Sequence, residues 1–154
     1  MVKESFISSS MKKNHEKIER LLEEFKKSIG KDMVVIKSKF KKFKWELEKH
    51  TFIEEKAIFT FYNPEKDEEG EYSNMADIED EHDEILETMS KIEKDLEEGR
   101  VNRFMVSEMQ ELLKKHQEFE DEFLYPKLDK KLNASQKKII SEKVKEIAEN
   151  YSNK

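Results

Sequence analysis

The sequence predicts an all-α protein, an antiparallel, up-down four-helix bundle with an additional short C-terminal helix. Charged residues make up 43% of the 154 residues, whereas glycine (3) and proline (2) are scarce, and this composition favours long helices. Apolar residues recur in alternating steps of three and four, which sets them on one face of each helix. Runs of β-branched residues bounded by turn residues, which strands need, do not occur at useful length.

The first two helices are expected on either side of Gly30. Serines at positions 8–10 offer N-caps for a first helix that runs to about Ile29, where Gly30 ends it. The second helix is expected over about 32–62, before Pro64 breaks it. The apolar face of the first contains Met11, His15, Ile18, Leu22, Phe25 and Ile29, and that of the second contains Ile36, Phe40, Phe43, Leu47, His50, Glu54, Ala57 and Phe61.

The next two helices follow the one clear loop, residues 63–73 (NPEKDEEGEYS), which is acidic and contains helix breakers. A third helix is expected over about 74–98, with Gly99 after it. A fourth begins near Asn102 or Arg103 and continues until Pro126 kinks or ends it. The third helix has Met75, Ile78, His82, Ile85, Met89, Ile92 and Leu96 on its apolar face, and the fourth has Met105, Met109, Leu113, His116, Glu120 and Leu124.

A capping box predicts the start of the last helix. Asn133 is followed by Gln136 three residues later, which indicates a helix from Ala134 to about Asn150. Short connections between long amphipathic helices make an antiparallel bundle the economical packing, with the last helix alongside it. A chain of this length suits one domain, so residues 1–154 are expected to form a single domain.

The composition excludes several classes of function. With no cysteine, the chain has no disulfides, thiolate metal sites or thiol redox chemistry. Its 36 acidic and 30 basic residues are intermixed, which indicates a solvated surface and argues against nucleic acid as a partner. No apolar run approaches the roughly 18 residues that span a bilayer. The N-terminus also lacks the apolar stretch of a secretion signal, so we expect a cytoplasmic protein that does not bind membranes.

Four histidines occur in the chain, one on each helix of the expected bundle. His15 precedes His50 by 35 residues, and His82 precedes His116 by 34, so the chain contains two copies of one unit. The second histidine of each unit has a glutamate four residues later, on the same helix face. The six residues are His15, then His50 with Glu54, then His82, then His116 with Glu120.

The two glutamates lie in register with the apolar faces. A single histidine on such a face is more often a hydrogen-bonded core residue, and a single His-x-x-x-Glu pair is more often a surface contact. Burying an ionised carboxylate without compensation costs several kcal/mol or more, however, and bound cations would supply the compensation. Together, Glu54, Glu120 and the four histidines therefore predict a buried metal site.

The ligand types indicate which metal this site would hold. Six nitrogen and oxygen ligands without sulfur disfavour structural zinc, which is usually four-coordinate. If both glutamates bridge, each of two ions receives two imidazoles and two carboxylate oxygens, with room for a bridging oxo or hydroxo group and open positions. Iron fits this set best and manganese next. Each candidate glutamate follows its histidine by four residues, which is not the Glu-x-x-His spacing of ferritin-like di-iron bundles.

At these residues the chain resembles the hemerythrin-like (HHE cation-binding) family. The resemblance rests on N-H-E-K-I at His15, H-T-F-I-E-E-K-A-I-F from His50, E-H-D-E-I around His82 and H-Q-E-F-E-D-E-F-L-Y-P from His116. It implies a four-helix bundle around a non-haem di-iron centre. The four histidines would then be iron ligands, and Glu54 and Glu120 would be bridging carboxylates.

Two positions differ from the oxygen-carrying members of that family. Those proteins have a fifth histidine one turn from the third-helix ligand, where this chain has Ile78 and Leu86. Their last carboxylate follows its histidine by five residues, which here would be Asp121. On a straight helix position +5 lies about 140° from His116, against about 40° for Glu120, so Glu120 is preferred and Asp121 is the alternative. The set of four histidines and two glutamates is more similar to di-iron proteins linked to nitrosative stress and iron–sulfur cluster repair.

The resemblance implies a protein that binds or reduces oxygen, nitric oxide or peroxide at a carboxylate-bridged di-iron centre. It leaves open whether the chain is a di-iron oxidoreductase or a non-enzymatic module for iron or oxygen sensing or for iron storage. Residues Ile53, Ile78, Leu86 and Phe119 are expected to line a dry apolar pocket. Four acids flank the ligands and either orient the imidazoles or lie on the solvated surface; they are Glu16, Glu46, Glu81 and Glu122.

Overall fold

The computed structural model describes residues 6–61 and 75–151, and nearly all of these are helical. The helices are α1 (Phe6–Ser28), α2 (Met33–Lys56), the 3₁₀ helix η1 (Ile58–Phe61), α3 (Met75–Glu97), α4 (Arg103–Phe119), the π-helix η3 (Glu120–Leu124), α5 (Tyr125–Lys131) and α6 (Ala134–Tyr151). No strand occurs within the described residues. The expected all-α class is therefore confirmed.

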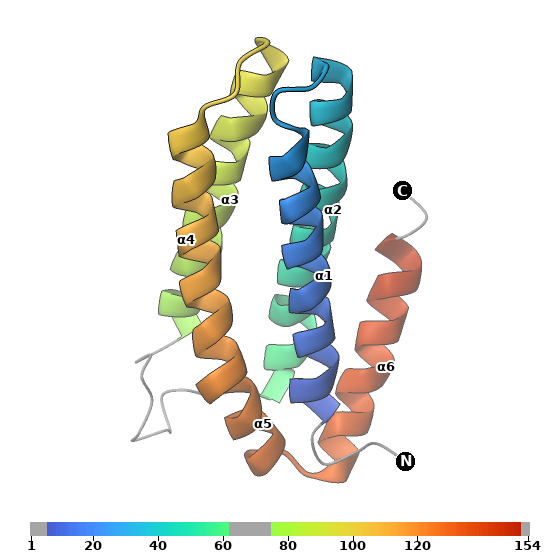
Figure 1. Cartoon of the computed structure of the whole chain (residues 1–154). Coiled ribbons are helices and arrows are strands. Elements are labelled where there is room, and N and C mark those ends of the chain that lie inside the picture. Colours follow the sequence, from blue (N-terminus) through green and yellow to red (C-terminus); the bar gives the residue numbers. More distant parts are fainter. Residues whose placement is uncertain (1–5, 62–74, 152–154) are drawn as a thin grey trace.

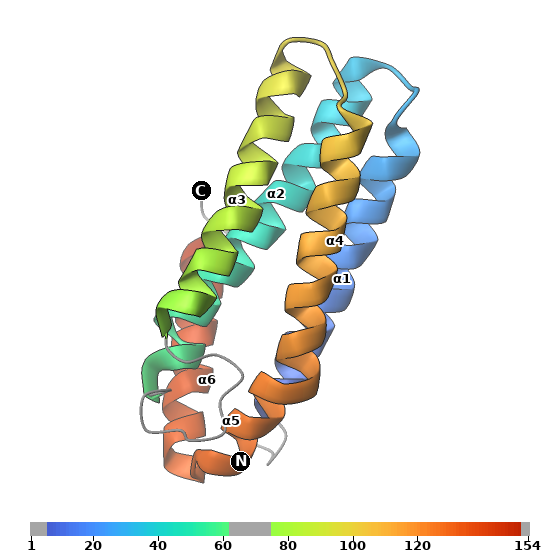
Figure 2. The ribbon, with the colours of Figure 1, turned by 90° about the vertical axis from the view of Figure 1, so that its left-hand side faces the viewer.

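The four long helices lie side by side, and successive helices run in opposite directions (Figure 1). Helix α2 contacts α1 and α3, and α3 contacts α4. Helix α6 packs outside this group, against α2 and η1, while α5 contacts α1 at the lower end (Figures 1 and 2). None of the described helices is long and apolar enough to cross a membrane.

Local signals define several helix ends as expected. Gly30 and Gly99 follow α1 and α3 with φ angles of 105° and 79°, a region that glycine enters without steric cost. The capping box before α6 is formed, because the Asn133 N–H donates to Gln136 Oε1 and the Gln136 N–H donates to Asn133 Oδ1, at 3.0 and 2.8 Å. Asn102 caps α4 by accepting a hydrogen bond from the Met105 N–H.

The serine cap expected for the first helix is wrong. Helix α1 already begins at Phe6, so the serines at 8–10 lie inside its first turns. Two of its free N–H groups are instead satisfied from another helix. The N–H groups of Ile7 and Ser8 donate to the two carboxylate oxygens of Asp129 on α5, at 2.9 and 2.8 Å. An acceptor 121 residues away cannot be identified from local sequence.

The second and fourth helices also differ from expectation. Helix α2 ends at Lys56, and the chain tightens into η1, where the Thr60 N–H donates to the Ala57 carbonyl. Pro126 does not end the fourth helix, because it lies in the first turn of α5, where a backbone N–H is not required. The expected loop 63–73 and the side chain of Met75 lie outside the described residues.

The buried apolar residues form two clusters at different heights. The upper cluster lies toward the α1–α2 and α3–α4 turns and contains Ile18, Leu22, Phe25, Ile36, Phe40, Phe43, Leu47, Ile85, Met89, Ile92, Leu96, Val106, Met109 and Leu113. The lower cluster lies toward α5 and α6 and contains Ile7, Met11, Ile53, Ala57, Ile58, Phe59, Ile78, Leu124, Tyr125, Leu128 and Ile140. The layer between the two clusters is polar.

Candidate metal centre

The polar layer contains all six residues that the sequence predicts as metal ligands. Each long helix passes from one apolar cluster to the other through this layer, and a histidine occupies the crossing point. On α1, for example, His15 lies between Met11 of the lower cluster and Ile18 of the upper cluster. The four histidines are at most 4% exposed, and Glu54 and Glu120 are 0% exposed.

The histidines form two pairs through their Nε2 atoms. His15 Nε2 lies 3.2 Å from His50 Nε2, and His82 Nε2 lies 3.1 Å from His116 Nε2. Two imidazole nitrogens that bind one ion at about 2.1 Å and at right angles are separated by about 3.0 Å. Each pair therefore has nearly the spacing that ligands of a common ion need.

Each carboxylate lies between the two pairs. Glu54 Oε1 is 3.0 Å from His50 Nε2 and 3.3 Å from His82 Nε2. Glu120 reaches His15 with Oε1 at 3.1 Å and His116 with Oε2 at 3.2 Å. Every glutamate thus contacts one histidine of each pair, as a bridging ligand would.

Two of these oxygens indicate that the layer fits a cation. Glu54 Oε1 and Glu120 Oε2 are fully buried and have no hydrogen-bond partner, although imidazole nitrogens lie 3.0–3.3 Å away. Buried polar atoms without a hydrogen bond are rare and call for an explanation such as a bound ion. Potential ligand atoms within 4.8 Å of one another form two groups: Glu54, His82, His116 and Glu120, and His15, His50 and Glu120.

The electrostatics of the layer match this interpretation. Burial lowers the pKa of His15, but hydrogen bonds to Asp121 and Glu120 and the charges of Glu120 and Glu54 outweigh it and raise the pKa to about 9. Burial also lowers the pKa of His82, but the hydrogen bond to Glu54 and the charge of Glu54 outweigh it and raise the pKa to about 9. Burial would raise the pKa of Glu54, yet the charge of His50 and hydrogen bonds in the layer hold it well below its usual range. A cation would therefore displace imidazole protons, and its affinity should increase with pH.

A second set of side chains holds the outer ring nitrogens. Each Nδ1 atom lies within hydrogen-bonding distance of one side-chain oxygen: His15 with Asp121 (2.9 Å), His50 with Asn14 (3.2 Å), His82 with Glu55 (3.0 Å) and His116 with Glu81 (2.8 Å). Such contacts fix the ring orientation and aim Nε2 inward.

These contacts follow the internal repeat. The residue before the first histidine of a unit contacts the second histidine of that unit, as Asn14 does with His50 and Glu81 with His116. The residue after the glutamate of each unit contacts the first histidine of the other unit, as Glu55 does with His82 and Asp121 with His15. From the sequence, Glu81 was expected among the flanking acids and Asp121 only as the alternative bridging ligand, whereas Asn14 and Glu55 were not identified.

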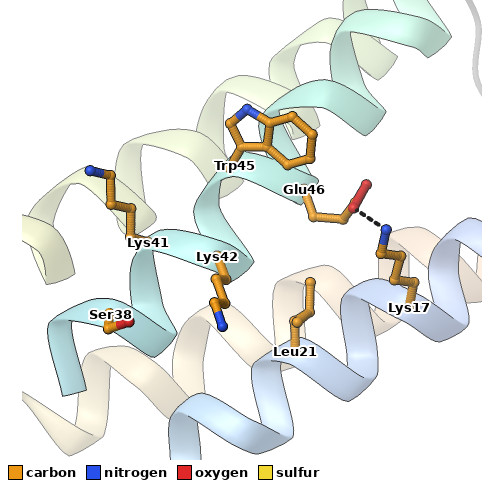
Figure 3. A pocket seen from close by; sticks show the side chains of 7 residues that line it. All are labelled: Lys17, Leu21, Ser38, Lys41, Lys42, Trp45 and Glu46. Carbon is orange, nitrogen blue, oxygen red and sulfur yellow. Dashed lines mark ion pairs between the residues drawn. The ribbon is translucent and has the colours of Figure 1, made fainter. Parts of the chain in front are cut away.

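The other flanking acids lie elsewhere. Glu16 and Glu122 are exposed. Glu46 is buried, but its oxygens pair with Lys17 and Lys49 at 2.9 and 3.0 Å. The pair with Lys17 spans a groove of about 470 Å³ between α1 and α2 (Figure 3). The groove is lined by Lys17, Leu21, Ser38, Lys41, Lys42, Trp45 and Glu46, so it shares no residue with the polar layer.

Glu120 and Asp121 both contact His15, from opposite sides of its ring. Glu120 lies inside the layer next to Nε2. Asp121 has a side chain that is 28% exposed, and its Oδ1 lies 2.9 Å from Nδ1. The π-helix η3 begins at Glu120, and this wider turn brings both carboxylates to the same ring.

Tyr125 also belongs to the layer, although it was not among the residues predicted from the sequence. Its side chain is 0% exposed, and its O–H donates to Glu54 Oε2 at 2.6 Å and lies 3.3 Å from His15 Nε2. Burial, followed by the charges of Glu120 and Glu54, raises its pKa well above the usual value, so the phenol keeps its proton. The only sequence signal was its place in the L-Y-P motif.

The four residues expected to line an apolar pocket lie on both sides of the layer. Ile53 and Ile78 belong to the lower cluster, with Phe119 packed against it, while Leu86 packs against the upper cluster.

The fold and the layer together define a helical protein with a buried imidazole–carboxylate site suited to cations. A family model, the hemerythrin HHE cation binding domain, matches residues 7–128. The chain therefore belongs to this family, as the histidine and glutamate motifs indicated. Searches of curated proteins and of solved structures gave no match.

Proposed function

We propose that this chain, as an antiparallel four-helix bundle, holds two iron ions between His15, His50, His82, His116, Glu54 and Glu120, and binds or reduces a small ligand there. The ligand would be oxygen, nitric oxide or peroxide.

One observation carries the proposal. The imidazole nitrogens form two pairs, with separations of 3.2 and 3.1 Å, and each buried carboxylate contacts one member of each pair. A single ion would need only one pair, and the carboxylates would then have no reason to contact both pairs. Two ions that share two carboxylates account for both features.

The ligand chemistry favours iron, with manganese next. Imidazole and carboxylate together suit iron, and no thiolate is available to select zinc or copper. When bound, iron would supply Lewis-acid polarisation and electrons to the small ligand.

The chain itself would control access and protons. The upper and lower clusters exclude water on both sides of the layer, which strengthens electrostatic interactions within it. Tyr125 keeps its proton at the hydroxyl oxygen and holds Glu54 Oε2 in place. The partners of the Nδ1 atoms hold the four rings in their orientation.

Metal analysis tests the proposal directly. Protein produced with excess iron should contain two irons per chain and, in air, show the near-ultraviolet absorption of a diferric centre. Glu54→Gln should lower the iron content, whereas Glu48→Gln on the same helix should leave it unchanged. A colourless protein with less than one iron per chain would contradict the proposal.

Turnover separates the two kinds of function. Repeated consumption of hydrogen peroxide or nitric oxide by each iron centre would identify an oxidoreductase. Stoichiometric binding, with a large rise in melting temperature on metal addition, would instead identify a sensing or storage module, since a ligand that binds only the folded state stabilises it.

A further inference from the structure

The repeat that builds the layer is broken at one position. Glu55 and Asp121 occupy equivalent places in the two units, and both present a carboxylate to an Nδ1 atom. Asn14 and Glu81 are also equivalent, but Asn14 presents a neutral amide oxygen to His50 where Glu81 presents a carboxylate to His116. The His82–His116 pair thus has two carboxylate partners, and the His15–His50 pair has one.

This difference changes how well each pair binds a cation. A carboxylate that accepts from Nδ1 makes the imidazole a stronger donor through Nε2 and fixes its orientation. Loss of such a partner typically lowers metal affinity by about 10- to 100-fold. The contact of His50 with Asn14 is also the longest of the four, at 3.2 Å, against 2.8 Å for His116 with Glu81.

The glutamates add a second, independent difference. Ligand atoms of Glu54, Glu120, His82 and His116 all lie within 4.8 Å of one another, whereas the group that contains both His15 and His50 includes Glu120 alone, although Glu54 Oε1 is 3.0 Å from His50 Nε2. Tyr125 contributes to this, because its O–H holds the other oxygen of Glu54 and lies 3.3 Å from His15 Nε2. One half of the layer therefore holds four ligand atoms within 4.8 Å of one another, whereas in the other half Glu54 approaches His50 but does not group with His15.

We propose that the two metal positions are unequal, and that a divalent cation fills the position of His82 and His116 first and more tightly. Glu55 and Glu81 act as positioning residues for that site, and Asn14 keeps the other site weaker. This inference rests on the two-ion centre proposed above. It predicts an intermediate with one metal per chain rather than simultaneous filling.

Zinc titration followed by nuclear magnetic resonance tests the order of filling. Zn²⁺ is diamagnetic, and the chain has only four histidines, so ¹⁵N-histidine labelling yields four pairs of ring signals. In metal-free protein, the signals of His82 and His116 should change during the first equivalent and those of His15 and His50 during the second. Competition with a chelator should give two dissociation constants at least about 10-fold apart.

Two isosteric substitutions test the cause. Asn14→Asp should tighten the second site by about 10-fold and bring the two constants together, while Glu81→Gln should loosen the first site by a similar factor. Glu55→Gln provides a second test of that site should Glu81→Gln fail to fold. Glu84→Gln, which removes an exposed charge from α3, is the matched control and should change neither constant.

The outcomes distinguish this inference from the proposed function. Binding of fewer than two Zn²⁺ ions per chain would contradict the two-ion centre and the inference together. Two ions that bind with equal constants, or that reach His15 and His50 first, would overturn the inequality and leave the two-ion centre standing. An unchanged second constant in Asn14→Asp would refute the role given to Asn14.

Discussion

Glu120→Gln should reverse its effect on the stability of the metal-free protein between low and high pH. The substitution keeps the size of a fully buried side chain and removes its charge. Glu120 helps to raise the pKa of His15 to about 9 and that of His116 well above its usual value. A raised histidine pKa stabilises the fold fully below the unfolded value of 6.5, and this stability is lost as pH rises through the folded pKa.

The magnitude follows from the shift. A rise from 6.5 to about 9 corresponds to an upper limit of roughly 3 kcal/mol for His15, at about 1.4 kcal/mol per unit. After the hydrogen bond to Asp121, Glu120 raises this pKa through both a hydrogen bond and its charge, and it also raises the pKa of His116. At pH 6 the variant should therefore lose on the order of 2 kcal/mol or more. Near pH 10, above the pKa of about 9 of His15, this imidazole has lost its proton, and removing a buried carboxylate should leave stability unchanged or increased.

Urea unfolding of chelator-treated protein at the two pH values measures this difference. Glu122→Gln is the control, because it removes an exposed charge from the same π-helix and should change stability by under about 1 kcal/mol at both pH values. An equal loss for Glu120→Gln at pH 6 and pH 10 would show that Glu120 does not share charge with the histidines. It would also remove the electrostatic argument for a cation in the layer.

Three further substitutions test residues in the polar layer, at the start of α1 and in the upper cluster. Tyr125→Phe removes the donor to Glu54 Oε2 and should destabilise the metal-free protein by about 1–3 kcal/mol in urea unfolding. Asp129→Ala removes the acceptor for the first N–H groups of α1 and should cost about 0.5–2 kcal/mol, with faster hydrogen exchange at the start of that helix. Met89→Ala opens a cavity in the upper cluster and should cost about 2–5 kcal/mol, yet metal analysis should still find the wild-type metal content.

Helix faces and inward-pointing ligands could be predicted because both depend on local periodicity. His15, His50, His82 and His116 lie in register with apolar residues, and that register alone placed them inside the fold. The capping box at Asn133 is local in the same way. The cap of α1 could not be predicted, since its acceptor comes from Asp129, far along the chain.

The partners of the outer ring nitrogens required the repeat as well as the helix. Asn14, Glu55 and Asp121 are partly exposed or polar residues next to ligands, and adjacent positions on one helix face different directions. Their role depends on which helix lies beside them, which sequence periodicity does not specify. The repeat in the sequence shows that Asn14 and Glu81 occupy equivalent positions in the two units, as do Glu55 and Asp121.

The choice between Glu120 and Asp121 assumed a regular α-helix, and the helix is not regular at these residues. On a straight α-helix only one of two consecutive residues can point toward His116, and this reasoning selected Glu120. The chain instead widens into a π-helix at Glu120, where the Tyr125 N–H bonds the carbonyl five residues earlier. The wider turn lets Glu120 contact His15 and His116 inside the layer while Asp121 holds the outer nitrogen of His15. The same turn carries Tyr125 to Glu54, so one local departure from α-helical geometry brings three side chains to the layer.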